Sequence, residues 1–277
     1  MPVKIKDKVL TEYQREININ LEEIYQKEKI NLSKLIDKDP VEFVHRFPDN
    51  KSKEIAGFLS SQFAYGKIDL FKKFLENIFN CMDEDLTLFI NKGNFSFFEG
   101  FYYRFQKSKD IISLFDVLKT IIDEFGSMGN MVKHFYQCDA RETLWNIREY
   151  YFRNNDELKF FFPKRSKSNP LKRWNLYFRW MVREDEVDTG LWNFIDKKDL
   201  IIPLDTHIFK IGKCLGWTKC KTPTYKAATE ITKALKCFAP DDPLKYDLFL
   251  CHRVGIGATC TGKKTDECIQ KCIIYKN

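Results

Sequence analysis

Residues 169–180 combine a lysine with a hydrophobic and aromatic helix in a way that could support nucleophilic chemistry. Lys172 lies in the expected first turn of this helix, directly before Arg173. The partial positive charge of a helix N-terminus, the neighbouring arginine and partial burial all disfavour the protonated form of such a lysine. The unprotonated amine is the form that attacks an electrophile. The segment therefore predicts a nucleophilic lysine, and the alternative is a basic side chain that contacts only phosphate or solvent.

A second segment, residues 203–212, offers a carboxylate at the start of another helix. Asp205 precedes residues whose apolar positions repeat at helical spacing, which predicts that it is the N-cap. A carboxylate held in this position is also suited to stabilising a cationic transition state. We expect His207 to be a structural or phosphate-side residue, because no second histidine or carboxylate lies at a spacing typical of metal ligands.

The charge of the chain is concentrated near the first of these segments. The 277 residues include 46 Lys and Arg against 39 Asp and Glu, a net charge of +7, and residues 163–173 contain no acid. This predicts a polyanionic partner, with a solvated basic loop as the alternative. No apolar stretch is long enough to cross a bilayer. We therefore expect a cytoplasmic, nucleoid-associated monomer that does not bind membranes.

The elements that must position these residues are predicted to be helices. Only 12 Gly and 9 Pro interrupt the chain, no β-hairpin signal or repeat occurs, and apolar residues recur at helical spacing. The fold class predicted is all-α, with Ser52 as the N-cap of one helix and loops at 91–105 and 154–168. Helices are expected at 12–36, 52–64, 68–80, 85–90, 110–125, 131–138, 141–152, 170–182, 206–215, 225–237 and 243–254.

Two motifs carry a resemblance to a known family. Residues 204–211, followed by Cys214-Leu215-Gly216, resemble the segment around the essential aspartate of the helix-hairpin-helix DNA glycosylases. Residues 58–62 (Phe-Leu-Ser-Ser-Gln) are similar to the family's Leu-Ser-x-Gln segment. The resemblance covers residues 50–260 and implies two helical lobes with a DNA-binding cleft between them. It implies a central domain at 51–175 and a second domain formed by 1–50 with 176–277.

The resemblance also implies roles for individual residues. Asp205 would be the catalytic carboxylate and Lys172 the nucleophile, with Lys167 and Lys164 as rivals. Lys172 and Asp205 are 33 residues apart, a longer separation than in most branches of the family, and in this the chain resembles the archaeal 8-oxoguanine glycosylases. Residues 163–169 occupy the place of the family's glycine hairpin. The implied DNA contacts include a wedge that enters the base stack, formed by Gln62 and Tyr65, and the residues Lys164, Arg165, Ser166, Lys167, Ser168, Arg173 and His207. The implied base pocket is lined by Trp174, Phe178 and Trp180, and the alternative for these three rings is packing in the core.

The function implied is removal of a damaged base, an oxidised purine, from double-stranded DNA. The base must first leave the stack. Lys172 would then form a Schiff base that permits strand cleavage, and no cofactor is required. The alternatives are a non-catalytic helical protein of the same fold that binds nucleic acid, or an RNA-associated protein that lost the activity.

Nine cysteines are present, and the last four crowd the C-terminal tail. Cys251, Cys260, Cys268 and Cys272 are similar in position to the iron–sulfur loop that ends endonuclease III, although their spacing is wider. Only Cys268 and Cys272 approach a usual ligand spacing. We expect buried thiols here, with an iron–sulfur cluster or zinc as the alternative.

Overall fold

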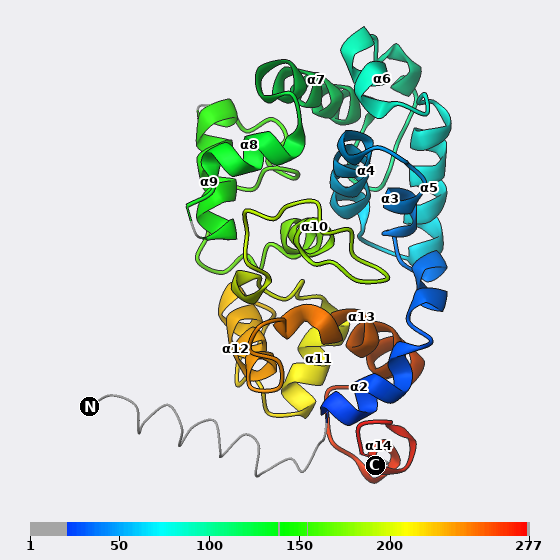
Figure 1. Cartoon of the computed structure of the whole chain (residues 1–277), viewed down its shortest axis with the longest axis vertical. Coiled ribbons are helices and arrows are strands. Elements are labelled where there is room, and N and C mark those ends of the chain that lie inside the picture. The colour runs from blue at the N-terminus through cyan, green and yellow to red at the C-terminus, as the bar shows by residue number, and fades with distance from the viewer. Residues whose placement is uncertain (1–20, 138, 154, 276–277) are drawn as a thin grey trace, which may run out of the picture. The chain divides into compact units, whose positions relative to one another are not determined.

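The computed structural model describes residues 21–275 apart from 138 and 154, and these residues are predominantly helical (Figure 1). The strand-like pairings among them are two isolated bridges, Tyr103 with Gln106 and Glu184 with Thr189. The prediction of an all-α fold is therefore confirmed. None of the helices described is both long and apolar enough to cross a membrane.

Contacts divide the chain into two compact units. Unit one comprises residues 21–35, Lys167–Arg179 and 196–275, and unit two comprises Ile36–Ser166 and Trp180–Ile195. Compared with the central domain expected at 51–175, unit two begins earlier and takes in a later segment. Lys172 and Asp205 both belong to unit one.

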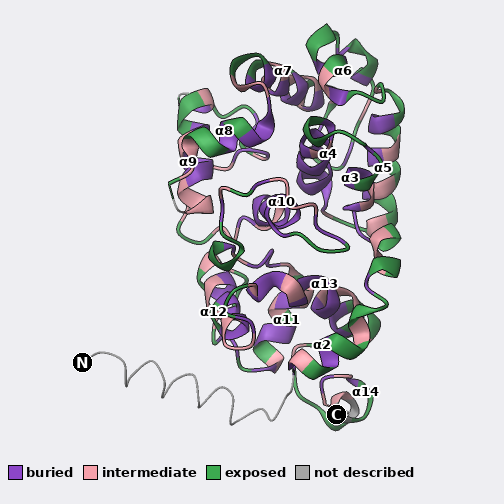
Figure 2. Ribbon diagram, in the orientation of Figure 1, coloured by how far each residue is buried: buried purple, intermediate pink, exposed green. Residues whose placement is uncertain are grey.

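Unit two is built around α4 (Asn50–Phe63), in which eleven of fourteen residues are buried (Figure 2). The N-cap of α4 is Asp49, whose side chain accepts the Ser52 backbone N–H, so the prediction that Ser52 caps this helix is wrong. Ser52 is buried instead, and its hydroxyl accepts the backbone N–H of Leu86 at 3.0 Å. The other helices of the unit are α3 (Glu42–His45), α5 (Ile68–Asn80), α6 (Leu86–Lys92), η2 (Ser96–Phe98), α7 (Ser108–Phe125), α8 (Met128–Phe135) and α9 (Ala140–Phe152).

A buried acid links α4 to distant parts of unit two. Glu54 Oε2 accepts the backbone N–H of Gly129 at 2.9 Å, and Oε1 accepts the indole N–H of Trp192 at 2.8 Å. Burial raises the pKa of Glu54, and these hydrogen bonds oppose the rise. A Cβ at position 129 would lie 2.2 Å from Glu54 Oε1, so the close packing of α8 on α4 requires glycine there.

Unit one gathers segments from both ends of the described chain. Its elements are α2 (Leu21–Lys29), the first part of α10 (Lys172–Val182), η3 (Lys197–Asp199), α11 (Thr206–Cys214), α12 (Tyr225–Lys236), η4 (Pro243–Tyr246), α13 (Asp247–Phe249), η5 (Leu250–Gly257) and α14 (Asp266–Lys271); η1 (Ser33–Lys38) crosses from unit one into unit two. Two contacts join α2 to the later segments. Glu22 Oε2 pairs with Lys245 Nζ at 2.7 Å and also accepts the Tyr246 hydroxyl. Although burial opposes the change, these contacts lower the pKa of Glu22 to about 2.

Helix α10 is buried on all sides from Trp174 to Val182, as Figure 2 shows by its colour. It carries a charge into the interior of unit one, where the Arg179 guanidinium contacts the Asp247 carboxylate and both side chains are at most 5% exposed. Buried charges of this kind are tolerated when they are paired. In unit two, the buried Arg183 pairs in the same way with Asp188.

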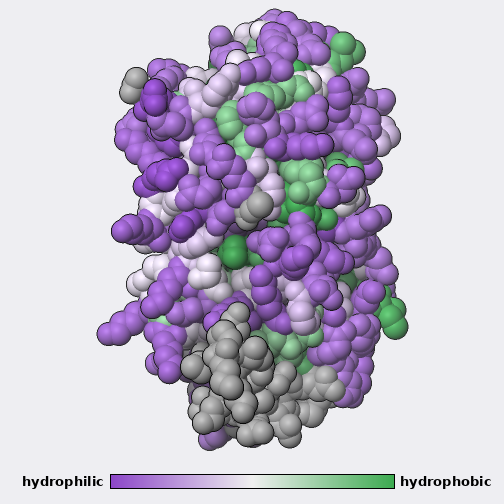
Figure 3. Space-filling view, turned by 60° about the vertical axis from the view of Figure 1, so that its left-hand side comes forward, coloured by the Kyte–Doolittle hydropathy of each residue, from purple (hydrophilic) through white to green (hydrophobic). Residues whose placement is uncertain are grey.

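Three expected helices differ from the structure. The first, expected over 12–36, is the shorter α2 followed by the 3₁₀ helix η1, and residues 12–20 lie outside the described part of the chain. The helix expected over 131–138 is α8, which begins at Met128 and ends at Phe135. The last, expected over 243–254, is divided into η4, α13 and η5, and η5 is a π-helix. The surface in Figure 3 is mainly hydrophilic, and hydrophobic residues are exposed there in separate patches.

Candidate functional site

Lys172 is presented by a constrained turn at the start of α10. The preceding residue, Leu171, is buried and has a φ of 53°, a left-handed conformation that is costly for a residue with a Cβ. Asn169 Oδ1 accepts the Leu171 N–H at 3.0 Å, and Asn175 Nδ2 donates to the Pro170 carbonyl at 2.9 Å. Strain of this kind persists when neighbouring groups fix it and is common at functional sites. The turn leaves Lys172 partly exposed at the first position of α10.

Asp205 is the N-cap of α11, as predicted. Its Oδ1 accepts the Ile208 backbone N–H at 2.7 Å. Its Oδ2 faces the thiol of Cys251, with a sulfur–oxygen distance of 3.6 Å. The side chain is partly exposed, and contacts on both oxygens define its orientation. A carboxylate oriented in this way can stabilise a cation formed in front of it.

The π-helix η5 packs closely on the first turn of α11. An ideal Cβ at Gly255 would lie 2.6 Å from His207 Cβ and 3.4 Å from His207 Nδ1, so glycine is needed for this approach. The Nδ1 atom of His207 is buried and has no hydrogen-bond partner among the described residues. Single π-helical turns frequently occur at functional sites. Asp205, His207, Cys251 and Gly255 therefore form one cluster, which we call the α11–η5 cluster.

The basic run at 163–173 is divided between the two units. Lys167, Ser168 and Arg173 belong to unit one, where Tyr225 donates its backbone N–H to the Ser168 carbonyl at 2.9 Å. Lys164, Arg165 and Ser166 belong to unit two, where Lys164 Nζ lies 2.7 Å from Asp156 Oδ1 and Arg165 Nη2 lies 3.1 Å from Glu142 Oε2. Part of the positive charge of this run is thus compensated within unit two.

The residues expected to enter the DNA stack or line a base pocket are mostly buried. Gln62 is fully buried in the last turn of α4, so a wedge role would require it to leave this position. Tyr65 is partly exposed. Trp174 and Phe178 in unit one and Trp180 in unit two are all at most 3% exposed, which agrees with core packing, the alternative that the sequence left open.

Cys214, Cys260, Cys268 and Cys272 lie near enough to influence one another's pKa, whereas Cys251 lies apart from them against Asp205. The thiol of Cys214 donates to Cys260, which lowers the pKa of Cys260 to about 6, whereas burial opposes this change. Cys214 Sγ also lies 3.7 Å from the Tyr275 hydroxyl. Cys268 contacts the Thr265 hydroxyl at 3.3 Å, and burial raises the pKa of Cys272. Within the part of the chain that the structure describes, no group of three or more His, Cys, Asp or Glu side chains is placed to hold a metal ion.

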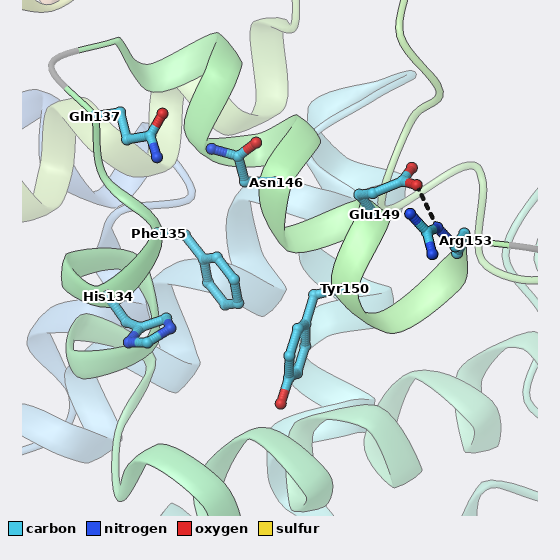
Figure 4. Close-up of a pocket in the computed structure, with 7 residues that line it drawn as sticks. All are labelled: His134, Phe135, Gln137, Asn146, Glu149, Tyr150 and Arg153. Atoms are coloured by element: carbon cyan, nitrogen blue, oxygen red, sulfur yellow. Dashed lines mark hydrogen bonds and ion pairs between the residues drawn. The ribbon is translucent and has the colours of Figure 1, made fainter.

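Unit two also contains a pocket of about 570 Å³ at the outer face of α9. Figure 4 shows that Glu149 and Arg153 lie together on one side of it, where Arg153 Nε donates to Glu149 Oε1 at 2.8 Å. None of the residues predicted to act in catalysis or DNA binding lines this pocket. Its lining residues are His134, Phe135, Gln137, Asn146, Glu149, Tyr150 and Arg153.

Sequence reasoning did not connect Cys251 and Gly255 with Asp205. The sequence predicts for Cys251 only a weak role as a metal ligand, whereas its thiol lies against the Asp205 carboxylate. A signal was available in the glycines at 255 and 257, because small residues after an apolar run indicate the close approach of another backbone. The left-handed turn at Leu171 has no comparable signal in the sequence.

A family model matches residues 39–256 of the chain, and its description is "Protein of unknown function (DUF2400)". No curated protein and no solved structure matches the chain. The predicted membership of the helix-hairpin-helix glycosylases is therefore wrong. Two short motifs had suggested it. The one at Asp205 is explained by helix capping, and the one ending at Gln62 lies in the buried helix α4.

Proposed function

The chain belongs to the DUF2400 family, and we propose that it acts on damaged double-stranded DNA, releasing a base through covalent attack by Lys172. The observation that carries this proposal is the strained turn at Leu171, which holds Lys172 at the N-terminus of a buried helix. Asp205, in the same unit, supplies an oriented carboxylate.

The reaction would begin with the unprotonated amine of Lys172. Its lone pair attacks C1′ of the deoxyribose, the N-glycosidic bond breaks, and the base leaves with the bonding electrons and takes up a proton. The attached nitrogen then loses one proton, and the C1′–O4′ bond breaks as the ring oxygen O4′ takes up a proton, which gives an iminium Schiff base that keeps one proton on nitrogen. Loss of a proton from C2′ and cleavage of the C3′–O bond would then break the strand.

Asp205 would act on the cationic character that develops at C1′ as the base departs. A negative charge already oriented by its neighbours stabilises such a transition state without further reorganisation. The Cys251 thiol on Oδ2 and the Ile208 N–H on Oδ1 supply that orientation. Cys251 is therefore proposed as a positioning residue for Asp205.

The basic residues around Lys172 would hold the DNA backbone. Three residues close to Lys172 in the sequence of unit one can contact phosphates: the basic Lys167 and Arg173, and the hydroxyl-bearing Ser168. Contacts of this type position the duplex and carry no sequence information. The preference for an oxidised purine depended on the glycosylase resemblance, so the damaged base is treated as a variable in the test.

Borohydride trapping tests the proposal, because reduction of the Schiff base leaves a stable bond between protein and DNA. The duplexes carry an oxidised purine, an oxidised pyrimidine or an abasic site. We expect an adduct that disappears in Lys172→Gln and persists in Lys226→Gln. Lys226 is a matched control because it is an exposed lysine in the first turn of α12, in the same unit. Lys167→Gln and Lys164→Gln test the rival nucleophiles.

Absence of an adduct with every duplex would refute the catalytic proposal, and an adduct that survives Lys172→Gln would refute the assignment of Lys172. Asp205→Asn should abolish base release while DNA binding is kept, because asparagine is also a good N-cap and preserves the helix.

The second candidate function is a nucleic-acid-binding protein without catalysis. It is favoured by the burial of Trp174, Phe178 and Trp180, which leaves the expected base pocket without exposed rings. DNA binding without any trapped adduct would support this alternative.

A further inference from the structure

A four-residue turn in unit two carries an exposed arginine and an exposed phenylalanine. Tyr103 and Gln106 exchange both backbone hydrogen bonds, each at 2.9 Å, which leaves Arg104 and Phe105 at the tip. Arg104 has a φ of 53°, and Phe105 is 69% exposed. A left-handed non-glycine residue at the tip of a turn indicates that its surroundings fix the conformation.

Side chains from three segments fix this turn. The Tyr65 hydroxyl donates to the Gln106 side chain, and the Tyr103 hydroxyl donates to the Tyr65 carbonyl. The ring of Tyr103 stacks on Phe74 of α5, with centroids 4.9 Å apart. The turn is thus anchored to the core of unit two, although its tip lies in solvent.

Three flat groups face one another at the tip. The rings of Tyr65 and Phe105 are parallel to within 7°, with centroids 6.5 Å apart. The guanidinium carbon of Arg104 lies 5.8 Å and 5.5 Å from these two centroids. A Cβ at Gly66 would lie 2.6 Å from Arg104 Nη1, so glycine is needed for the arginine to occupy this position. Exposed aromatic rings and guanidinium planes are the groups on which unpaired nucleobases stack.

The charge around these groups suits a polyanion. Tyr65 lies in residues 60–68, a segment without Asp or Glu. Its ring contacts Phe105 and Phe160, which lie in two further segments without Asp or Glu, 100–109 and 158–166. Three basic residues of these segments pair with acids elsewhere in unit two, namely Lys109, Lys164 and Arg165. Four others form no ion pair within 4 Å among the described residues, namely Lys67, Arg104, Lys107 and Lys159, although Lys159 helps to lower the pKa of Asp156.

We infer that Tyr65, Arg104 and Phe105 form a stacking platform for unpaired bases of a DNA strand, with the surrounding lysines contacting its phosphates. The inference deepens the proposed function and rests on its claim that the chain binds DNA. It does not depend on catalysis by Lys172. The platform belongs to unit two, whereas Lys172 and Asp205 belong to unit one.

Fluorescence anisotropy of a labelled short oligothymidylate tests the platform. Removal of one stacking ring costs about 1–3 kcal/mol per base, so Phe105→Ala should weaken binding about 5- to 150-fold. Arg104→Ala should weaken binding. It should also make the slope of log K against log salt concentration shallower by the amount expected for the loss of about one phosphate contact. Phe97→Ala is the matched control, because Phe97 is 57% exposed in the same unit and its ring contacts Phe89 and none of the platform residues. It should bind as the wild type does.

Circular dichroism confirms that each variant is folded before binding is compared. Wild-type affinity in Phe105→Ala, or equal losses in Phe105→Ala and Phe97→Ala, would overturn the platform. So would oligothymidylate binding no tighter than that of an undamaged duplex. Trapping that fails with every duplex while Phe105→Ala still weakens oligothymidylate binding refutes the catalytic proposal alone. Trapping that succeeds while Phe105 is irrelevant refutes the platform alone.

Discussion

Replacement of Gly255 by alanine should separate η5 from α11 and so disturb the carboxylate of Asp205. The added Cβ would lie 2.6 Å from His207 Cβ, whereas ordinary contact begins at 3.4 Å, so the two backbones must move apart by about 0.8 Å. Neither group is the flexible end of a long side chain, so a rotamer change cannot relieve the clash. A misplacement of about 1 Å in a catalytic group can cost about 10²-fold in rate, and we expect a loss of this order in trapping.

Stability should change much less than activity. Overpacking costs about 1–3 kcal/mol, and replacing a helical glycine by alanine recovers about 0.5–1 kcal/mol, so the net loss is at most about 2.5 kcal/mol. Urea denaturation measures this change, and the rate of borohydride trapping measures the effect on the site. The control is Gly216→Ala, just beyond α11, where an added Cβ meets nothing within 4 Å but the φ of 72° strains alanine, so it should lose stability without separating η5 from α11. A wild-type trapping rate in Gly255→Ala would refute the idea that this contact holds Asp205 in place.

Three further predictions concern charge. Asp247→Asn removes the carboxylate charge that faces the buried guanidinium of Arg179 and should cost about 3–5 kcal/mol in urea denaturation, most of it recovered when Arg179→Met is added. Cys260 has a pKa of about 6, so just above pH 6 iodoacetamide should alkylate it faster than the other cysteines, and below pH 6 protonation of its thiolate should slow the reaction. Cys214→Ala removes the thiol that donates to Cys260 and should slow alkylation of Cys260 at the same pH. Peptide mass spectrometry measures the rate at each cysteine. The pKa of Glu22 is lowered from 4.5 to about 2, so the ionised side chain stabilises the fold fully above pH 4.5 and loses this contribution as the pH falls towards 2. The difference in free energy of unfolding between the wild type and Glu22→Gln should therefore shrink from pH 4.5 to pH 2.

Helices with a strong apolar period were predictable from the sequence. The expected helix at 68–80 is α5, and the end of α7 at Phe125 follows from Gly126, whose φ of 76° suits glycine. The cap at Asp205 was predictable for the same local reason. These features depend on residues within one or two turns of one another.

Features that depend on distant residues were not predictable. The apolar and aromatic run at 243–254 has the period of a single helix, whereas the structure divides it, and η5 lies close to His207 in another element. The position of Ser52 suggested a cap, but Asp49 precedes it and takes that role, which leaves the serine hydroxyl to bind Leu86. Sequence spacing alone carries no information on such partners.

The division of the chain between the two units has a consequence for its synthesis. The segment Ile36–Ser166 leaves the ribosome before Trp180–Ile195, yet Glu54 in the first segment needs the indole N–H of Trp192 in the second. Until that tryptophan is available, the buried carboxylate of Glu54 lacks one of its donors, an arrangement that costs free energy. Unit two is therefore completed only after residues of unit one, Lys167–Arg179, have been translated. A fragment that ends at Ser166 should accordingly be translated in full and remain incompletely folded.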